Sequence, residues 1–423
     1  MNFSDSEIVR SVLISAGYTP VENYKEADII LINTCSIRDN AEQRVLNRLQ
    51  EFGFMKKKKP HLKIGILGCM AERLKEELMK LQQSVDLVVG PDAYRDLPNL
   101  LSAVESGERA VNVLLSEDET YAEIEPVRLD DNQVSAFIAI MRGCENFCAY
   151  CVVPYTRGKE RSRDYETIVG EARKLFEQGY REVTLLGQNV NSYRYEDVNF
   201  AQLLARVADI NPLLRVRFAT SHPKDLSDEL LQTMSQYPNI CKAIHLPVQS
   251  GSDAILQKMK RKYDRAWYLD RISVIRHYMP DCSISTDIIA GFCGETESDH
   301  QDTLSIMETV GYSSAFMFKY SERPDTFAAK NYPDDVPDDV KSRRLTEIID
   351  KQQSLSLCSN QADIGKTFEV LIEGVSKKSA ERYFGRNSQN KVVVFNRNDE
   401  NIGDYVHVKI TGCTAITLIG ESL

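Results

Sequence analysis

Long apolar runs are absent from the 423-residue sequence, since none approaches the ~18 residues that a membrane span needs. Ten cysteines are too few for a disulfide scaffold, and no charged-then-apolar signal segment opens the chain. Basic residues are outnumbered, with a formal net charge of −10, which excludes wholesale electrostatic binding of nucleic acid and leaves room for a local basic patch. We therefore expect a protein of the reducing cytoplasm, not bound to membranes, whose thiols are buried or bind metal.

Three of the cysteines stand close together in the middle of the chain. Cys144, Cys148 and Cys151 form a C-x3-C-x2-C loop that contains no histidine to complete a zinc site. Three thiolates in a short loop can hold three irons of a [4Fe-4S] cluster. The fourth iron can then chelate the amine and carboxylate of S-adenosylmethionine, whose one-electron cleavage is radical chemistry. The alternatives are a zinc knuckle that lacks one ligand, or three unrelated buried thiols.

Basic residues surround this loop. Five of them outnumber the two acidic residues Glu145 and Glu160: Arg142, Arg157, Lys159, Arg161 and Arg163. We expect the arginines to form a patch for a phosphate or an anionic cofactor, because guanidinium groups are fixed planar donors. A second basic run, Lys56 to Lys59, is expected to be a solvated loop.

Residues 1–120 alternate short apolar runs with amphipathic stretches. Strands are predicted at 27–33, 63–68 and 86–90, with helices after Arg38 and Ala71, which indicates a doubly wound α/β domain. Cys35 and Cys69 directly follow the first two runs. Since the carboxyl ends of neighbouring parallel strands share one edge, a common ligand site is plausible there. Residues 115–133 are acidic and aperiodic, and we interpret them as a linker.

Residues 134–357 repeat the strand–helix rhythm six times. Strands are predicted at 135–141, 182–187, 214–219, 243–248, 283–289 and 314–318, which fits a partial (βα)6 barrel with its chemistry on the loops after the strands. Polar residues follow these strands, and their positions make Gln188, Ser221, Gln249 and Arg261 candidate contacts to S-adenosylmethionine. His222 and His245 are expected in the pocket wall or core.

Residues 360–423 change pattern again. Five short alternating segments separated by Gly, Asn and Asp predict a small antiparallel β-barrel, a shape often used to bind RNA. Tyr383 and Phe384 could stack on bases, although aromatic residues of so small a barrel are more often core.

Three long motifs carry a resemblance to a known family: residues 33–45, residues 151–163 and residues 245–252. Together with the order of the three domains, they resemble the MiaB branch of the radical S-adenosylmethionine methylthiotransferases, the tRNA-2-methylthio-N6-dimethylallyladenosine synthases. The resemblance implies that the terminal barrel is a TRAM domain. It also implies methylthiolation of C2 of N6-isopentenyladenosine at position 37 of tRNA, with S-adenosylmethionine as both methyl donor and radical source.

The resemblance further implies two [4Fe-4S] clusters. Cys144, Cys148 and Cys151 would hold the radical cluster, and Cys35, Cys69 and a third cysteine would hold the second. The family carries that third cysteine in a Gly-Cys-Gln-Met-Asn motif, whereas this sequence begins at Met1-Asn2. We therefore expect the first strand and its cysteine to precede residue 1. Implied partners are the tRNA anticodon stem-loop, an electron donor such as a flavodoxin-type protein, and a sulfur donor system.

Two other functions compete with this one. A sister methylthiotransferase would act on threonylcarbamoyl-adenosine in tRNA or on an aspartate of a ribosomal protein. A non-enzymatic iron-sulfur protein would bind RNA through the terminal barrel and use its clusters as sensors. Reductive cleavage of S-adenosylmethionine separates the second of these from both enzymes, because a sensor would not cleave it.

Overall fold

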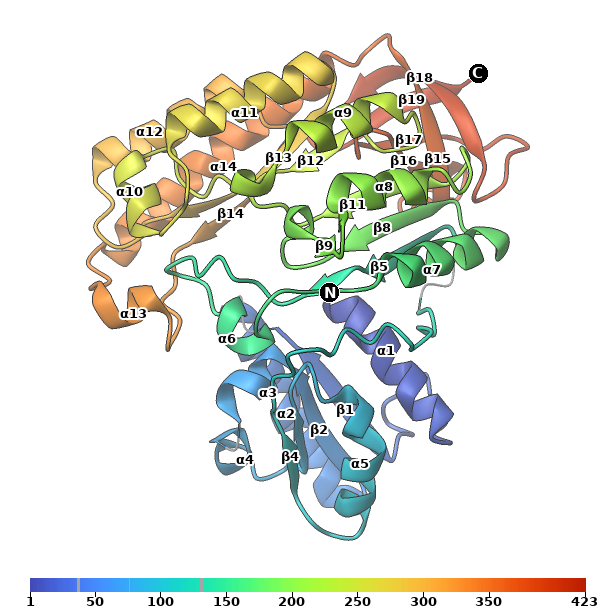
Figure 1. Ribbon diagram of the computed structural model, residues 1–423, viewed down its shortest axis with the longest axis vertical. Coiled ribbons are helices and arrows are strands. Elements are labelled where there is room, and N and C mark those ends of the chain that lie inside the picture. The colour runs from blue at the N-terminus through green and yellow to red at the C-terminus, as the bar shows by residue number, and fades with distance from the viewer. Residues whose placement is uncertain (36–38, 76, 130–132) are drawn as a thin grey trace. The chain divides into compact units, whose positions relative to one another are not determined.

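The computed structural model describes residues 1–35, 39–75, 77–129 and 133–423, which divide into two compact units (Figure 1). Unit 1 comprises Met1–Leu129, Met141–Phe147 and Cys151–Arg163. Unit 2 comprises Asp130–Ile140, Cys148–Tyr150 and Asp164–Leu423. Most of the cysteine loop therefore belongs to unit 1, although its sequence lies between two strands of unit 2.

Unit 1 is built on a parallel sheet with helices on both faces. Its strands lie in chain order: β1 (Ile29–Thr34), β2 (Lys63–Gly68), β3 (Leu87–Val89) and β4 (Ala110–Asn112). The first three were predicted; β4 was missed, because its apolar run is broken at Asn112. The helices are α1 (Asn2–Ser15), α2 (Asp39–Lys58), α3 (Cys69–Leu74), α4 (Glu77–Leu81), α5 (Leu97–Glu105) and the 3-10 helix η1 (Tyr94–Asp96).

Two apolar cores lie on opposite faces of this sheet. Ile64 and Ile66 of β2 pack with Leu49 of α2, whereas Leu67 packs with Leu101 of α5 in the other core. Neighbouring residues of a strand point to opposite faces, so the continuous apolar run of β2 serves both cores. The doubly wound arrangement predicted for this part of the chain is confirmed.

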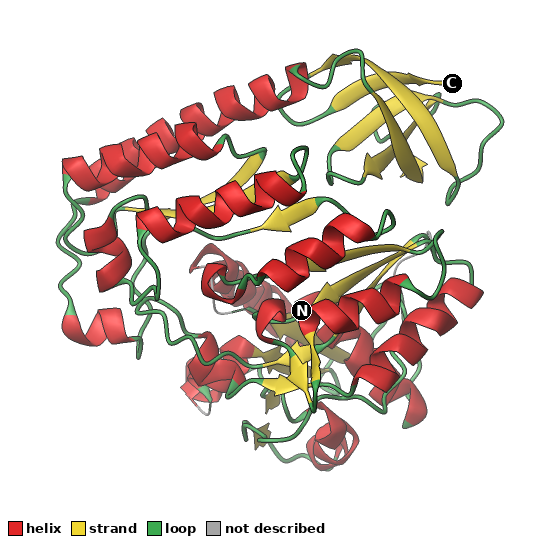
Figure 2. Cartoon of the chain, turned by 45° about the horizontal axis from the view of Figure 1, so that its top comes forward, coloured by secondary structure: helices red, strands yellow, loops and turns green. Residues whose placement is uncertain are grey.

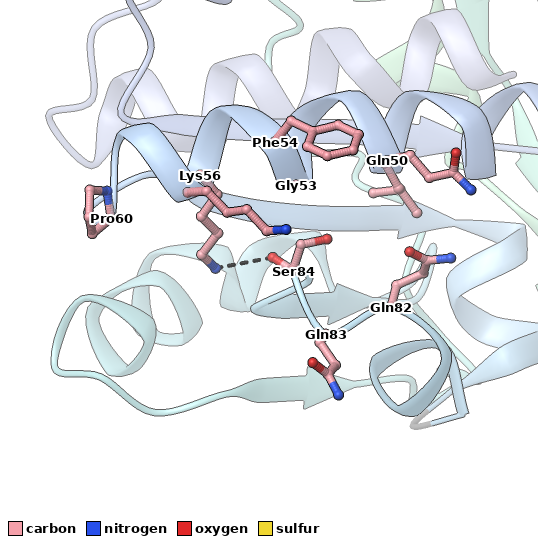
Figure 3. A pocket seen from close by; sticks show the side chains of 10 residues that line it. Gln50, Gly53, Phe54, Lys56, Pro60, Gln82, Gln83 and Ser84 are labelled. Atoms are coloured by element: carbon pink, nitrogen blue, oxygen red, sulfur yellow. Dashed lines mark hydrogen bonds between the residues drawn. The ribbon is translucent and has the colours of Figure 1, made fainter.

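The basic run at Lys56 to Lys59 is not the solvated loop that was predicted. Lys56, Lys57 and Lys58 form the last turn of α2. The Lys56 ammonium pairs with Asp86 and donates to the Ser84 carbonyl oxygen over 3.1 Å, beside a surface pocket of about 580 Å³ (Figure 3). The lysine run therefore ends helix α2, and Lys56 binds the segment that leads into β3.

The acidic stretch predicted as a linker has no helix or strand in its described part, 115–129 and 133; residues 130–132 lie outside the description. It does pack within unit 1, however. Tyr121 is only 2% exposed, stacks on Tyr94, and donates its hydroxyl to the Pro91 carbonyl oxygen over 3.0 Å. The first half of the stretch is therefore part of the domain and not a free linker, because the buried side chain of Tyr121 attaches it to unit 1.

Unit 2 contains the partial (βα)6 barrel, and all six predicted strands are present: β5 (Ser135–Ala139), β8 (Glu182–Leu186), β11 (Arg215–Ala219), β12 (Ala243–His245), β13 (Ser283–Ala290) and β14 (Ser314–Lys319). They form two parallel three-stranded sheets, β11-β8-β5 and β12-β13-β14. The helices around them are α7 (Tyr165–Glu177), α8 (Phe200–Ala208), α9 (Asp228–Gln236), α10 (Asp253–Lys258), α11 (Arg265–Tyr278), α12 (Glu297–Val310), α13 (Phe327–Asn331) and α14 (Asp338–Gln361).

Several of these helices begin at side-chain caps that the sequence encodes. Asp164, Asn199, Ser227, Asp264 and Thr296 each accept a backbone N–H of the first turn of the helix that follows. Because such caps satisfy amides that the helix itself leaves unpaired, they fix where each strand-to-helix loop ends. The loops that could hold a ligand are therefore short and bounded.

The carboxy-terminal barrel follows α14 (Figure 2) and closes with the order β15-β16-β17-β19-β18. Its strands are β15 (Thr367–Val375), β16 (Arg382–Asn387), β17 (Val392–Asn396), β18 (Tyr405–Cys413) and β19 (Leu418–Ser422). The predicted antiparallel barrel is wrong at one place, where β17 and β19 pair in parallel. Five strands cannot close a ring with directions that alternate throughout, so one parallel pair is required. Tyr383 is buried in the core of this barrel with Phe395.

Across the described ranges, no helix is both long enough and apolar enough to cross a membrane.

Candidate functional site

Cys35 and Cys69 stand at equivalent ends of neighbouring strands, as the sequence predicts. The last paired residues of β1 and β2 are Thr34 and Gly68, and each cysteine follows directly. Gly68 has a φ of +87°, and a Cβ there would lie 2.7 Å from the Thr34 carbonyl oxygen. Glycine is therefore required for β2 to turn into α3, of which Cys69 is the first residue.

Arg157 contacts one of these two cysteines. It ends α6 (Val153–Arg157), a short helix that follows Cys151 and packs against α3. Its Nε donates to Cys69 Sγ over 3.3 Å, and its Nη2 donates to Asp5 Oδ2 over 2.6 Å. The guanidinium is buried, and its Nη1 has no hydrogen-bond partner among the residues described. A segment of the cysteine loop thus lies against the Cys69 site.

The neighbouring arginines are buried in ion pairs as well. Arg142 is 1% exposed and pairs with Asp5 over 3.0 Å, while Arg161 pairs with Asp92 over 3.0 Å. Both arginines belong to a small two-stranded sheet, β6 (Met141–Arg142) and β7 (Arg161–Ser162). The predicted basic patch is therefore wrong for these residues, because carboxylates distant in sequence neutralise them. Lys159, by contrast, has a side chain that is 71% exposed.

The pKa shifts of Asp5 and Arg157 both favour the charged forms of this buried pair. Burial opposes ionisation of Asp5, but Arg157 and Arg142 outweigh it and lower the pKa of Asp5. Burial likewise opposes the charge of Arg157, yet Asp5 and the Cys69 sulfur hold the pKa of Arg157 well above its usual value. The three buried guanidinium groups of Arg142, Arg157 and Arg161 share two carboxylates, Asp5 and Asp92, so one positive charge is left over among these five side chains.

Glu72, which the sequence gave no reason to single out, lies one helical turn beyond Cys69 on α3. It is 3% exposed, and its Oε2 has no hydrogen-bond partner within the described part of the chain. Burial raises the pKa of Glu72 to about 7, Asp92 adds to the effect, and Lys75 opposes it. The only signal in the sequence is the three-residue spacing from Cys69, which places both side chains on one face of the helix.

The beginning of the C-x3-C-x2-C loop is held by backbone contacts within unit 1. Cys144 N donates to the Gly158 carbonyl oxygen over 3.1 Å, and Asn146 Nδ2 donates to Cys144 Sγ over 3.5 Å. Gly143 has a φ of +83°, and a Cβ there would come within 1.8 Å of the Lys159 carbonyl oxygen. Only glycine fits this approach of two backbones.

Cys148 lies in unit 2, where Arg261 contacts it. Arg261 Nη1 donates to Cys148 Sγ over 3.3 Å, Nη2 to the Pro247 carbonyl oxygen over 2.8 Å, and Nε to the Tyr263 hydroxyl over 2.8 Å. Each nitrogen of this guanidinium thus has a protein partner. Arg261, which is predicted as a contact to S-adenosylmethionine, donates here to a cysteine of the loop.

Three other predicted contacts occupy the ends of barrel strands. Gln188 Oε1 and Ser221 Oγ are buried and have no partner among the described residues, and the same holds for both amide atoms of Asn191. The loops after β8 and β11 that carry them are joined by a bond from Val190 N to the Thr220 carbonyl oxygen. Gln249 is 6% exposed, and its backbone bonds to β13.

Buried polar atoms without a partner cost about 1–3 kcal/mol each, so they suit a polar ligand that supplies the missing bonds. Amide and hydroxyl groups can bind the amine, carboxylate and ribose of S-adenosylmethionine, and the donor set therefore fits this cofactor. Asn191, three residues after Gln188, was not among the predicted contacts.

His222 is a buried residue of this region, as expected. Its Nδ1 accepts the Lys224 backbone N–H over 3.3 Å, and burial, with Arg261 nearby, lowers the pKa of His222 to about 2. The ring is therefore neutral at physiological pH. His245 bonds through Nδ1 to the Ser285 hydroxyl over 3.0 Å.

A further group of potential ligands, Glu297, His300 and Glu347, has ligand atoms within 4.8 Å of one another. Arg343 pairs with both carboxylates over 2.7 and 2.6 Å, and His300 bonds to Glu347 over 2.7 Å. The charges are already compensated, so this group is an ion-pair network of the barrel exterior.

Comparison with known proteins places each part of the chain. Residues 138–307 match the Radical SAM superfamily, residues 1–90 match the uncharacterized protein family UPF0004, and residues 361–423 match the TRAM domain. Among solved structures, the radical S-adenosylmethionine methyltransferase TsrM from Kitasatospora setae has a TM-score of 0.60 at 14% identity, covering 77% of this chain and 72% of that one. At that identity the likeness concerns the fold alone.

Curated relatives resemble the chain over its whole length. The tRNA-2-methylthio-N(6)-dimethylallyladenosine synthase of Phocaeicola vulgatus is 59% identical over 428 residues, covering 100% of this chain and 94% of that protein. The protein of the same name from Bacteroides fragilis strain ATCC 25285 is 58% identical, covering 100% and 93%. That from Amoebophilus asiaticus is 59% identical over 437 residues, covering 100% and 90%.

Proposed function

Since the chain belongs to the family of tRNA-2-methylthio-N(6)-dimethylallyladenosine synthases, we propose that it adds a methylthio group to C2 of N6-isopentenyladenosine at position 37 of tRNA. The observation that carries this proposal is an identity of 58–59% with relatives of that name, over the whole chain. The radical enzyme class agrees with the C-x3-C-x2-C loop and with the partial barrel.

Cys144, Cys148 and Cys151 would hold one [4Fe-4S] cluster with S-adenosylmethionine at its open iron. When bound, this pair supplies one-electron cleavage of the cofactor and so the power to remove the C2 hydrogen. Gly143 and Gly158 fix the backbone at the start of the loop, and Arg261 donates a hydrogen bond to the Cys148 sulfur. Such donors to ligand sulfurs stabilise the negative charge of an iron-sulfur site.

Cys35 and Cys69, with a third cysteine, would hold a second [4Fe-4S] cluster that carries the sulfur to be transferred, with S-adenosylmethionine as methyl donor. Their placement after paired residues of adjacent strands supports a shared site. Arg157 offers N–H donors to the Cys69 sulfur there. Hydrogen abstraction needs no general base, because the proton leaves C2 together with its electron as a hydrogen atom.

Gln188, Ser221 and Gln249, together with Asn191, are the proposed contacts to S-adenosylmethionine. The buried, unpaired atoms of Gln188, Ser221 and Asn191 support this assignment. Because these groups are withdrawn from solvent, they can bind the cofactor while water is excluded from the reacting atoms.

The proposed macromolecular partners follow from the same chemistry. The TRAM domain supports binding of the tRNA anticodon stem-loop. A flavodoxin-type protein is proposed as electron donor, and a sulfur donor system would replace the sulfur consumed in each turnover.

The test incubates reconstituted, reduced protein with S-adenosylmethionine and isopentenylated tRNA, and measures modified nucleosides and 5′-deoxyadenosine by mass spectrometry. We expect both products, and we expect Cys148→Ala to form neither while the terminal barrel stays folded. Cys358→Ala, which changes an exposed cysteine of α14, serves as control and should retain both.

Each contrary result has a distinct meaning. A methylthio product on threonylcarbamoyl-adenosine tRNA alone, or on a ribosomal protein, would replace the proposed substrate with that of a sister enzyme. No 5′-deoxyadenosine from the unmodified protein would contradict radical chemistry and favour the iron-sulfur sensor.

A further inference from the structure

Arg157 is a buried arginine that donates to a cysteine sulfur, as Arg261 does to Cys148. Buried guanidinium groups usually donate to carboxylates and carbonyl oxygens, whereas Arg157 Nε donates to Cys69 Sγ over 3.3 Å. Asp5 is fully buried and binds Nη2 over 2.6 Å, which fixes the plane of the guanidinium. Nη1 is left buried without a partner among the described residues.

Two features of Arg157 fit a bound ligand when taken together, although a buried nitrogen unpaired among the described residues by itself also occurs in Arg161 and Arg344. Arg157 has one donor committed to a sulfur and one donor left over in a place closed to water. A buried N–H without an acceptor costs about 1–3 kcal/mol, which a bound anionic group would recover. The donor set thus fits an iron-sulfur cluster attached to Cys69, whose sulfurs are weak acceptors that carry negative charge.

We propose that Arg157 is a positioning residue for the cluster on Cys69, holding the ligand sulfur through Nε–H and raising the reduction potential of the cluster. This inference rests on the proposed function, which assigns a cluster to Cys35 and Cys69. Reduction adds one negative charge to the cluster. A hydrogen bond to its ligand sulfur and a nearby positive charge both stabilise the reduced form, so the potential rises.

The neighbour Arg161 is a matched comparison. It lies four residues away, is also buried, and pairs with Asp92 in the same region of unit 1. Its hydrogen bonds within the described residues go to oxygen atoms: those of Asp92, the Arg157 carbonyl and the Ser116 carbonyl. A substitution at Arg161 disturbs a buried ion pair of the same kind without removing a bond to sulfur.

The experiment uses the full-length protein with Cys144, Cys148 and Cys151 replaced by alanine, so that one cluster remains. Its midpoint potential is measured by redox titration followed by electron paramagnetic resonance, with iron and sulfide counts. Arg157→Gln removes the charge and the Nε donor, and it should lower the potential by at least about 59 mV, a tenfold change in the ratio of oxidised to reduced cluster for one electron. Arg157→Lys keeps the charge, and its midpoint potential should lie between those of the parent and Arg157→Gln. The midpoint potential of Arg161→Lys should match that of the parent.

Three outcomes would overturn the inference. An unchanged potential in both Arg157 variants means that the contact is structural only, and an equal shift in Arg161→Lys means that any buried arginine has the same effect. If Arg157→Gln fails to fold, the conservative Arg157→Lys decides by the same criterion. If the parent protein, with Arg157 intact, holds no cluster, then Cys35 and Cys69 do not bind one and the proposed function is contradicted. If the parent shows a normal cluster signal and the Arg157 variants have the same potential, only the role of Arg157 is contradicted.

Discussion

Replacing Glu72 by glutamine should change how the stability of unit 1 depends on pH. Burial raises the pKa of Glu72 to about 7 from an ordinary value of 4.5, so the folded chain binds this proton more tightly than the unfolded chain does. The stability that follows is complete below about pH 4.5 and is lost as pH rises through about 7. Glu72→Gln cannot titrate and should show no such loss.

The difference between the two pKa values corresponds to about 3 kcal/mol over the whole range. Between pH 6 and pH 8.5 it amounts to about 1.4 kcal/mol, which is a tenfold change in the folding equilibrium. For a unit of about 150 residues this is about 3–6 °C in Tm. Comparing the slopes, rather than the Tm values themselves, cancels any constant cost of repacking glutamine at this site.

The assay is differential scanning calorimetry of the unmodified chain and its variants at the two pH values. The Tm of the unmodified chain should fall between pH 6 and pH 8.5 by about 3–6 °C more than that of Glu72→Gln. Glu77→Gln, which changes an exposed carboxyl of α4 nearby, should follow the unmodified chain. Parallel slopes for Glu72→Gln and the unmodified chain would refute the reasoning, because they would mean that this carboxyl is ionised in both states.

Three further variants test other parts of the site. Gly143→Ala should lose the iron of the radical cluster, because its Cβ collides with backbone, whereas Gly170→Ala, at an open position of α7, should keep the iron and stabilise the helix by about 1 kcal/mol; iron analysis decides. Asp5→Asn removes a buried carboxylate that pairs with Arg142 and Arg157, and it should cost about 3–5 kcal/mol, seen as a lower Tm. Ser221→Ala should weaken S-adenosylmethionine about tenfold in equilibrium dialysis while leaving the apo Tm unchanged, because its hydroxyl has no partner among the described residues.

The fold was predictable wherever strands lay in unbroken apolar runs. All six barrel strands and the first three strands of unit 1 follow from such runs. β4 is no shorter than β3 or β12, but its apolar run is broken at Asn112, and it was not found. The parallel pairing of β17 with β19 was open to a different argument, because an odd number of strands in a closed ring forces it.

The strand-end placement of Cys35 and Cys69 was predictable from the sequence, whereas the ion pairs around Cys69 were not. The spacing of Cys144, Cys148 and Cys151 and the strand ends at Cys35 and Cys69 are local features, visible without a structure. Asp5 lies 137 residues from Arg142 in sequence, so the residues near Arg142 do not indicate which carboxylate pairs with it. An arginine with a distant buried partner looks the same in sequence as one that awaits a phosphate.

Residues 141–147 and 151–163 belong to unit 1, which limits how the domains of this protein can be exchanged by recombination. A gene fragment that begins at the first barrel strand would encode Arg142, Arg157 and Arg161 but not Asp5 and Asp92, and so would encode three buried cations without their anions. The cost of such uncompensated charges is several kcal/mol each, enough to prevent the segment from folding as it does here. Recombination between related genes should therefore exchange the barrel together with its amino-terminal domain, so that the two domains are inherited as one unit.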